Sequence, residues 1–499
     1  MPTFKVPLII RGEIIEDYDV EFENRGMTGH LFSTPSVKKY INKLVAKSPV
    51  ILEDLYRISF DEICDYLDEL KSRLDLDTNV YWREAFEVAC LSSNLSRGVL
   101  EAIFRNSPSA LARENVRQIA EARIGIDYLE GWVRTSLRDG RAIEVRAVGS
   151  RAVHVIAGNV PVVPITTLLR NAMTRSDAIV KTPSNDPVTM GAIARTMIEM
   201  APDHPLTRHL SVAYWKGGDE EVEEAIYRPQ HIERIVAWGG FASIKHITKY
   251  LQPGIDLIPL EPKFSTTLIG KEALADDATM RDVARRAAAD MGGFDQEACS
   301  NARVMFLESG TDDEGIAAAN KFGQLVFEAV QNLPLSTSGG PLRFDPVLKG
   351  ELESLSHQDD FYRVFTDWPR VERTGAVIVS QFPEQVDFPG LLYGRVANIV
   401  PLDNIEDALD SFSAATKAAG VFPDDLRTRL RDKGALMGGQ NFIPVGYAIV
   451  GSGGAAPSDG IEPERRMCRW AVDLRADPQV NPGPWMHSEE IAEILARRA

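Results

Sequence analysis

From Arg151 to about Asp410, short runs of aliphatic and β-branched residues alternate with runs that have the apolar spacing of helices. The first of these runs are AVHVIAGN at 152–159, DAIVKTPS at 177–184 and IERIVAWGG at 232–240, and a helical stretch follows each one. Repeated strand-then-helix units predict parallel sheets with helices on both faces. Because such sheets bind ligands at the carboxyl ends of their strands, residues at those ends are the first candidates for a functional site.

The remaining segments have different patterns. Residues 1–30 contain short extended runs, and 36–133 are mostly amphipathic helix with apolar residues three and four apart. In the second alternating region, after Ser265, we expect helices near 280–291 and 315–332 and a strand at ARVMFLE. The glycine-rich stretch 451–460 predicts a flexible surface loop. The ending, PWMHSEEIAEILARRA, predicts a short amphipathic helix that serves either as an oligomer contact or as a cap.

Composition limits the possible partners. A chain of 499 residues is long enough for two or three domains. Its net charge of −17 argues against nucleic acid as a partner. No run approaches the ~20 apolar residues of a membrane span, and the N-terminus lacks the basic and apolar pattern of a leader. We therefore expect no membrane span and a cytoplasmic location.

The cysteines Cys64, Cys90, Cys299 and Cys468 lie far apart, with no CxxC pair. This spacing predicts neither a disulfide framework nor a metal site. Cys64 and Cys90 fall on apolar helix faces, which is typical of packed core cysteines. Cys299 instead lies among polar and small residues in FDQEACSNARV, just after a Met-Gly-Gly sequence. It is a candidate nucleophile, with a small side chain that merely fills a gap as the alternative.

Other candidates stand at the predicted strand ends. They are Gly158 with Asn159, Lys181 through Ser184, Gly239 with Gly240, and Glu261. No GxGxxG sequence follows any of these strands, so the usual dinucleotide fingerprint is absent. Both glycine-containing pairs are also compatible with ordinary tight turns. A phosphate site at these ends would need a different chemistry.

The order of these motifs, GNVPVVP, KTPSND, AWGGFAS, LEPK and QEACSNARV, resembles the aldehyde dehydrogenase superfamily. Most closely it is similar to the LuxC-type branch, the acyl-CoA or fatty acyl thioester reductases of bacterial luminescence systems and their relatives. The superfamily-like order covers about 151–410, and the LuxC likeness extends to the N-terminal segment and to IEPERRMCRW at 461–470. The resemblance implies an α/β fold with two parallel-sheet lobes, an N-terminal, mostly helical segment and a small oligomerisation element.

The resemblance also implies a domain division. Residues 1–260 would form the N-terminal segment and the NADP(H)-binding domain, which would also receive about 441–470. Residues 261–440 would form the catalytic domain that carries the nucleophilic cysteine. Residues 471–499 would be a C-terminal tail and a possible oligomer contact. We expect a homo-oligomer, because the superfamily commonly assembles through an edge strand and such a tail.

In the resemblance Cys299 matches the nucleophile, with Gln296 three positions before it and Arg303 leading into a strand. Thioester chemistry needs a thiolate, which is both a strong nucleophile and a good leaving group. Asn159 matches the asparagine whose amide forms an oxyanion hole together with the backbone N–H of the cysteine. The neighbouring carboxylates, Asp295 and Glu297, carry the wrong charge to activate a thiol. We therefore expect activation by dipoles or by the cofactor.

The cofactor residues follow from the same match. Lys181 corresponds to the lysine that reaches the adenosine ribose. Ser184 stands where NAD-preferring members often carry a glutamate, which would repel a 2′-phosphate. NADPH is therefore expected in preference to NADH. Gly239 and Gly240 correspond to the turn that lets backbone approach the pyrophosphate.

Two positions depart from the family pattern. Glu261 matches the general base of hydrolytic members, but Pro262 and Lys263 replace the usual Gly-Gly. Glu261 could activate water, deprotonate Cys299 or shuttle a proton to the thiohemiacetal. Leu391, in LLYGR, stands where the family has a coenzyme-contacting glutamate. The nicotinamide ribose would therefore be positioned differently.

The resemblance implies NADPH-dependent reduction of an acyl thioester to the aldehyde through an acyl-enzyme on Cys299. The donor would be an acyl-CoA or the thioester of an acyl carrier or another enzyme, and a fatty acyl chain is expected. Two alternatives stay open. One is an NAD(P)-dependent aldehyde dehydrogenase that makes the acid, with Glu261 as base. The other is a non-catalytic acyl-binding scaffold of the same fold.

Overall fold

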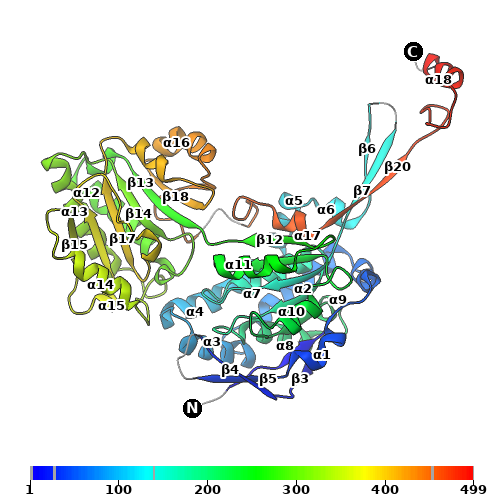
Figure 1. Cartoon of the computed structure of the whole chain (residues 1–499), viewed down its shortest axis with the longest axis horizontal. Coiled ribbons are helices and arrows are strands. Elements are labelled where there is room, and N and C mark those ends of the chain that lie inside the picture. Colours follow the sequence, from blue (N-terminus) through cyan, green and yellow to red (C-terminus); the bar gives the residue numbers. More distant parts are fainter. Residues whose placement is uncertain (1–3, 26–29, 139–140, 451–453, 498–499) are drawn as a thin grey trace.

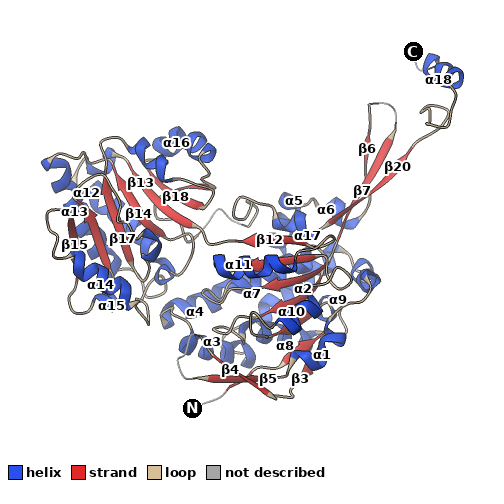
Figure 2. Ribbon diagram, viewed as in Figure 1, coloured by secondary structure: helices blue, strands red, loops and turns tan. Residues whose placement is uncertain are grey.

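The computed structural model describes residues 4–25, 30–138, 141–450 and 454–497. Figure 1 shows two lobes, a first one coloured blue to green and a second one coloured green to orange, and an arm that projects from the first lobe. In each lobe the strands lie between helices, as Figure 2 shows. The predicted α/β class with two parallel-sheet lobes is confirmed.

The first lobe contains a seven-stranded sheet. Its order is β12 (Asp256–Leu260), β11 (Arg234–Trp238), β8 (Arg151–Val155), β9 (Asp177–Lys181), β10 (Leu210–Ala213), β2 (Leu8–Ile10) and β3 (Glu13–Ile15). The strands from β12 to β10 are parallel, whereas β2 and β3 add as an antiparallel hairpin. The early extended runs thus complete this sheet.

Helices cover both faces of the first sheet because its central strands are apolar on both sides. In β9, Ala178 and Val180 join one core cluster, while Ile179 joins the cluster on the opposite face. The first face is covered by α7 (Val163–Met173) and α8 (Thr189–Met200). The second face is covered by α1 (Val37–Leu44), α10 (Glu220–Ile226) and α11 (Phe241–Ile247). A strand buried on both faces is the pattern expected of parallel sheets.

The segment before the first parallel strand is mostly helical, as predicted. It contains α2 (Phe60–Arg73), α3 (Val80–Ser92), α4 (Arg97–Asn106), α5 (Arg113–Arg123) and α6 (Ile126–Glu130). Ser59 and Glu62 form a capping box that fixes the start of α2. Cys64 is fully buried in the core of this segment, and Cys90 is packed against the same core. Both are packed cysteines, as their apolar helix faces indicate.

The second lobe contains another seven-stranded sheet. Its order is β15 (Tyr362–Thr366), β16 (Ala376–Ser380), β17 (Val396–Pro401), β14 (Ala302–Leu307), β13 (Phe264–Ile269), β18 (Thr416–Phe422) and β19 (Asn441–Pro444). Its helices include α12 (Asp277–Gly292), α13 (Asp313–Gln331), α14 (Pro346–Leu355), α15 (Val371–Thr374) and α16 (Asp424–Leu436). Only β15 is antiparallel to its neighbour.

Two further sheets are small. One joins β1 (Phe4–Lys5), β5 (Leu31–Thr34) and β4 (Val20–Glu23). The other forms the arm from β20 (Arg469–Arg475), β7 (Ala142–Val148) and β6 (Val133–Ser136). Beyond the arm, α18 (Ser488–Ala496) is the predicted C-terminal helix and lies at its far end in Figure 1. Within the described ranges, no helix is long and apolar enough to cross a membrane.

Two expected boundaries differ from the observed strands. The expected division places Asn441–Pro444 in the first lobe, but they form β19 and extend the second sheet beside β18. The crossover through α16 returns the chain parallel to β18, where a strand can satisfy its backbone hydrogen bonds. The tail boundary at 471 also cuts β20, which pairs with β7 from Arg469 to Arg475.

Candidate active site

A cleft of about 1250 Å³ lies where the carboxyl ends of the first sheet meet the amino ends of the second. The first lobe contributes the loops after β8, β9, β11 and β12, and the second lobe contributes the loop before β14 and the start of β18. The structure brings all of the sequence-predicted site residues to this one cleft: Asn159, Lys181, Ser184, Gly239, Gly240, Glu261 and Cys299.

The loop that carries Cys299 has an unusual backbone before the cysteine. Phe294, Asp295 and Gln296 have φ angles of 50°, 50° and 66°, a left-handed region that non-glycine residues rarely occupy. Asp295 stabilises this conformation because its buried carboxylate accepts backbone N–H groups of Ser96 at 2.7 Å and Gly339 at 2.8 Å. Hydrogen bonds to residues outside the loop therefore hold the predicted helix-to-strand loop in place.

Two amide side chains close the loop. Gln296 donates to the carbonyls of Ala302 and Val396 and accepts the Val396 N–H at 2.7 Å. Asn301 accepts the N–H of Ala298 at 3.0 Å and donates to carbonyls at the end of α12. Such a network holds a reactive side chain in a defined position.

Two cations approach Cys299, whose side chain is partly exposed. Lys417 is the second residue of β18 and contacts both Cys299 and the carboxylate of Asp459. Burial alone would lower the pKa of Lys417, but Cys299 and Asp459 outweigh that effect and raise it. Arg303 also lies near Cys299, and burial lowers the pKa of this arginine.

From the sequence, only dipoles and the cofactor are expected as activators of the thiol, and the structure adds these two neighbouring cations as candidates. The sequence did carry a signal, because Lys417 interrupts an otherwise apolar and small-residue strand, TKAAGVF. Over the described residues 454–460 the predicted surface loop is anchored at one point, because Asp459 is only 9% exposed and pairs with Lys417. Residues 451–453 lie outside the described ranges.

Asn159 lies directly against the cysteine loop. Its amide nitrogen donates to the carbonyl of Glu297 at 2.8 Å, two residues before Cys299. A Cβ on Gly158 would lie 2.6 Å from the Asn185 side-chain oxygen, so only glycine fits there. Asn185 also donates to the Gly158 carbonyl at 2.8 Å. The loops after β8 and β9 are thereby locked together.

The other end of the cleft is lined by aromatic and cationic groups. The ammonium of Lys181 lies 5.8 Å from the Tyr214 ring centre and 5.5 Å from that of Trp215. Burial, reinforced by the charge of Arg25, lowers the pKa of Lys181 to about 8. Ser184 forms a hydrogen bond with Tyr214. Residues that the sequence analysis missed also line this end, namely the cations Arg25 and Lys216 and the acids Glu21 and Glu23.

Glu261 and Leu391 have different surroundings. Glu261 is exposed on the connection from β12 to β13 and lines the cleft. Leu391 ends a short 3₁₀ turn and lies outside the cleft lining, although Arg303 donates to the carbonyl of its neighbour Gly390 at 2.8 Å. Although Leu391 stands at the sequence position of a coenzyme-contacting residue, its side chain does not line the cleft.

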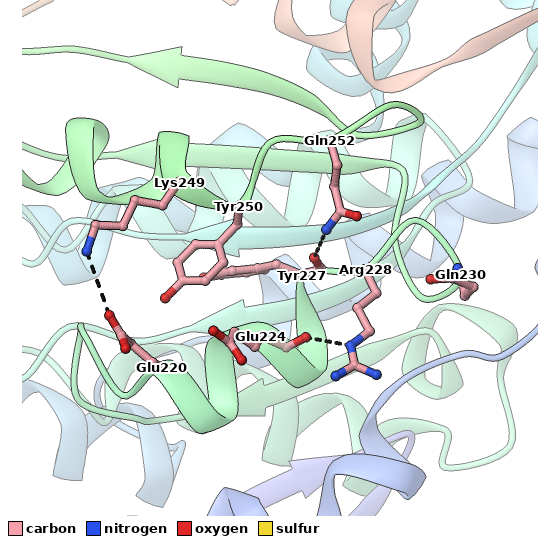
Figure 3. Close-up of a pocket in the computed structure, with 8 residues that line it drawn as sticks. All are labelled: Glu220, Glu224, Tyr227, Arg228, Gln230, Lys249, Tyr250 and Gln252. Carbon is pink, nitrogen blue, oxygen red and sulfur yellow. Dashed lines mark hydrogen bonds and ion pairs between the residues drawn. The ribbon is translucent and has the colours of Figure 1, made fainter.

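A second hollow of about 570 Å³ lies beside α10 and the residues after α11 (Figure 3). Glu220, Glu224, Tyr250 and Lys249 line it, and the Lys249–Glu220 pair spans it at 3.8 Å. None of the predicted site residues is there. Among residues 4–25, 30–138, 141–450 and 454–497, no group of three or more His, Cys, Asp or Glu side chains could hold a metal ion.

The fold is that of the aldehyde dehydrogenases. The structure matches a benzaldehyde dehydrogenase from Corynebacterium glutamicum with a TM-score of 0.69 and 13% identity, over 94% of this chain and 98% of that one. A glyceraldehyde-3-phosphate dehydrogenase from Bacillus halodurans matches with a TM-score of 0.71 and 12% identity, over 94% and 99%. At such identities the likeness concerns the fold.

The chain belongs to the LuxC family, described as acyl-CoA reductase, whose profile matches residues 55–470. A "long-chain acyl-protein thioester reductase" from Photorhabdus luminescens is 28% identical over 324 residues, 64% of this chain and 62% of the relative. The match thus spans less than two thirds of that relative. A protein of the same name from Vibrio harveyi is 26% identical over 487 residues, covering 94% of this chain and 93% of the relative.

Proposed function

We propose that this protein reduces acyl thioesters to aldehydes with NADPH, through an acyl group held on Cys299. The observation that carries the proposal is the one cleft in which Cys299 of the second lobe and Asn159 of the first lobe both lie. Membership of the LuxC family and the names of its relatives support the same reaction. A cysteine is the suitable nucleophile, because a thiolate both attacks a thioester and leaves readily.

The first step is acyl transfer. The Cys299 sulfur attacks the thioester carbon, and the C–S bond to the donor breaks as its thiolate leaves. One amide hydrogen of Asn159 is donated to the Glu297 carbonyl, and the second can be donated to the developing oxyanion. With the Cys299 backbone N–H as second donor, each positioned hydrogen bond lowers the barrier by about 3 kcal/mol.

The second step converts the acyl-enzyme to aldehyde. When bound, the nicotinamide supplies a hydride to the acyl carbon. Asn159 again stabilises the oxyanion, now of the thiohemiacetal on Cys299. Collapse of that adduct breaks the C–S bond, releases the aldehyde and regenerates the thiolate. Water must be excluded during these events, because it would hydrolyse the acyl-enzyme to acid.

The residues at the other end of the cleft fit a nicotinamide cofactor. Gly239 and Gly240 line the cleft, and a Cβ on Gly240 would project into open space, so bare backbone is available to a pyrophosphate. Lys181, Arg25 and Lys216 bring positive charge to the ribose end, and Ser184 adds no carboxylate. This positive charge supports NADPH over NADH, although Glu21 and Glu23 also line this end of the cleft.

The acyl donor is proposed to be a long-chain fatty acyl thioester. The names of the relatives specify long-chain acyl-protein thioesters, and the family description specifies acyl-CoA. Both donors present the same thioester carbon to Cys299. The donor thiol, whether of CoA, a carrier or another enzyme, leaves in the first step and takes no part in the second.

The functional test uses purified protein, a series of acyl-CoAs from short to long, and NADPH. We expect oxidation of NADPH with stoichiometric aldehyde, fastest for a long chain, and no oxidation with Cys299→Ala. Cys90→Ala is the matched control, because Cys90 lies in the helical segment away from the cleft. Undiminished turnover in Cys299→Ala would contradict the mechanism.

The position of Glu261 in the cleft supports one competing function, an aldehyde dehydrogenase that hydrolyses its acyl-enzyme. In that case free acid would accumulate from aldehyde and NADP⁺, and Glu261→Gln would stop hydrolysis while leaving acylation of Cys299 intact. The reductase proposal predicts aldehyde as product and retention of reduction in Glu261→Gln.

The arm supports a further part of the proposal, a homo-oligomer. Val472 and Leu474 on β20 are 61% and 53% exposed, and Trp485 beyond it is 71% exposed. Apolar side chains on a projecting sheet are typical of a surface that another chain covers. Size-exclusion chromatography with light scattering should give a mass of at least two chains. We propose a cytoplasmic location, where a reactive thiol stays reduced.

A further inference from the structure

Lys417 reaches the cleft because of an irregularity in the second sheet. Between β13 and β18, Phe264 pairs with Thr416 but Ser265 pairs with Ala418, so Lys417 is an extra residue in its strand. Such a bulge re-aims a side chain and is common next to active sites. The other side of β13 has the same irregularity, where Ser265 pairs with Ala302 and Thr266 with Val304.

The extra residue of that second bulge is Arg303. Both bulges therefore flank Ser265, whose hydroxyl donates to the Cys299 carbonyl at 2.8 Å. Lys417 and Arg303 both line the cleft, and they come from the two strands that flank β13. The backbone irregularities thus direct two cations to the nucleophile, instead of the apolar side chains that otherwise dominate β14 and β18.

Asp459, the carboxylate partner of Lys417, comes from a different part of the chain. Ser458 and Ile461 exchange two backbone hydrogen bonds, at 3.0 and 2.9 Å. Asp459 and Gly460 form the tip of this turn with φ angles of 52° and 74°. Asp459 then accepts from the Lys417 ammonium at 2.7 Å, with its side chain 6% exposed.

The turn is fastened to the first lobe. Arg123 donates to the Ala456 carbonyl at 2.6 Å, and Arg170 donates to the Ser458 hydroxyl at 2.9 Å. Both arginines also pair with Glu464, which is 1% exposed. The first lobe therefore positions Asp459, and Asp459 positions a lysine of the second lobe beside Cys299.

We propose that Lys417 is a catalytic residue that holds Cys299 as a thiolate, and that Asp459 is a positioning residue that fixes the Lys417 ammonium. The proposal rests on the proposed acyl transfer to Cys299. The thiol proton is released to solvent, so that the sulfur carries the negative charge and Lys417 keeps all three of its protons. An adjacent ammonium favours the thiolate, which is the nucleophilic form.

Charged groups from three other elements also line the cleft. Arg303 acts in the same direction as Lys417, whereas Glu297 on the cysteine loop and Glu261 on the inter-lobe connection oppose it. Glu297 is engaged by Asn94 at 2.6 Å, and burial raises its pKa. A raised pKa weakens the opposition from Glu297.

The test measures the rate of iodoacetamide alkylation of Cys299 at several pH values, with site occupancy read by peptide mass spectrometry. Neither acyl donor nor cofactor is present. Lys417→Met should slow alkylation about tenfold at pH 7, because about tenfold fewer molecules would carry Cys299 as the thiolate. The difference should vanish near pH 10, where the thiolate predominates in both proteins. Lys417→Arg should retain most of the rate because it keeps the charge.

Three further variants separate charge from folding. Lys417→Met combined with Asp459→Asn avoids leaving an unpaired carboxylate and should be as slow as Lys417→Met. Asp459→Asn alone should slow alkylation two- to fivefold, and asparagine tolerates the left-handed backbone at this turn. Lys433→Met removes an exposed lysine of the second lobe that pairs with Glu406, and it should change nothing.

An alkylation profile of Lys417→Met that matches the wild type at every pH would overturn the proposal, even in a protein that reduces acyl-CoA. A slow Lys417→Arg variant with native circular dichroism would also overturn it. Failure of the wild type to reduce any acyl thioester would instead contradict the proposed function. The two failures are therefore distinguishable.

Discussion

The cleft loop and the N-terminal helical segment both contain cysteines, but they surround the thiol in opposite ways. Burial among apolar side chains raises the pKa of Cys64 and of Cys90 to about 11. Cys299 instead is partly exposed and has Lys417 and Arg303 as charged neighbours. The comparison teaches that the surroundings decide whether a cysteine serves packing or chemistry.

The largest effect is expected when the cysteine of the cleft is changed conservatively. Cys299→Ser should reduce acyl transfer by about a thousandfold or more, because a hydroxyl lacks the acidity of a thiol. Its melting temperature should stay near that of the wild type. Turnover with each acyl-CoA and differential scanning fluorimetry measure the two effects. Strong residual activity in Cys299→Ser would contradict the role of the cleft cysteine as nucleophile.

A second prediction concerns the support of the charged region. Glu464→Gln leaves Arg123 and Arg170 buried without their carboxylate, and loss of such a partner costs about 3–5 kcal/mol. Urea unfolding at pH 7 measures the change. Glu462→Gln is the matched control, since its pair with Arg465 is half-exposed, and it should unfold like the wild type.

The pH dependence of that difference has a defined sign. Although burial acts to raise it, the pKa of Glu464 is lowered overall by Arg170 and Arg123. A lowered pKa in the folded state means that the stabilisation is present above the pKa of an unfolded glutamate and is lost as the pH falls through the folded value. The gap between wild type and Glu464→Gln should therefore shrink in acid. A gap that grows in acid would contradict the ion-pair description.

A third prediction changes the packed cysteine. Cys64→Ser introduces a hydroxyl into the core of the helical segment and should cost about 1–3 kcal/mol of unfolding free energy. Acylation of Cys299 should proceed at the wild-type rate in the folded protein. Urea unfolding and acylation by mass spectrometry measure both. A Cys64→Ser protein that is as stable as the wild type and fails to acylate would show that Cys64 serves the reaction and not the packing.

The smallest effect is expected at the cofactor end of the cleft. Ser184→Glu places a carboxylate beside Tyr214 and near Lys181, where it would repel a 2′-phosphate. The KM for NADPH should rise about tenfold, with the KM for NADH unchanged or lower. Ser184→Gln, of similar size and uncharged, is the control. Equal effects of the two substitutions would point to size and not to charge.

Much of the site could be predicted because its residues follow strands. Asn159, Lys181, Gly239 and Glu261 stand at or just after strand ends in the sequence, and parallel strands bring their ends to one edge. The helix-to-strand loop around Cys299 was predictable for the same reason. The α/β class followed from the alternation of β-rich and helical runs.

The charged partners of Cys299 could not be predicted in the same way. Lys417 reaches the cleft through a strand bulge, which has no sequence signature beyond a lone lysine among small residues. Asp459 lies in a stretch whose glycines and serines are typical of mobile loops, yet Arg123 and Arg170 fasten it from far away in sequence. The edge strand β19 is not predicted from the sequence because its pairing with β18 depends on the crossover through α16, which no local pattern indicates.

The central claim is that Cys299 carries the acyl group before reduction. The most direct measurement isolates the protein after brief exposure to a long-chain acyl-CoA, maps the added acyl mass to a peptide, and then adds NADPH. The account predicts a thioester on Cys299 that is discharged as aldehyde, with one NADPH oxidised for each acyl group. An acyl group mapped elsewhere, or a Cys299 thioester that yields only free acid in the presence of NADPH, would contradict it.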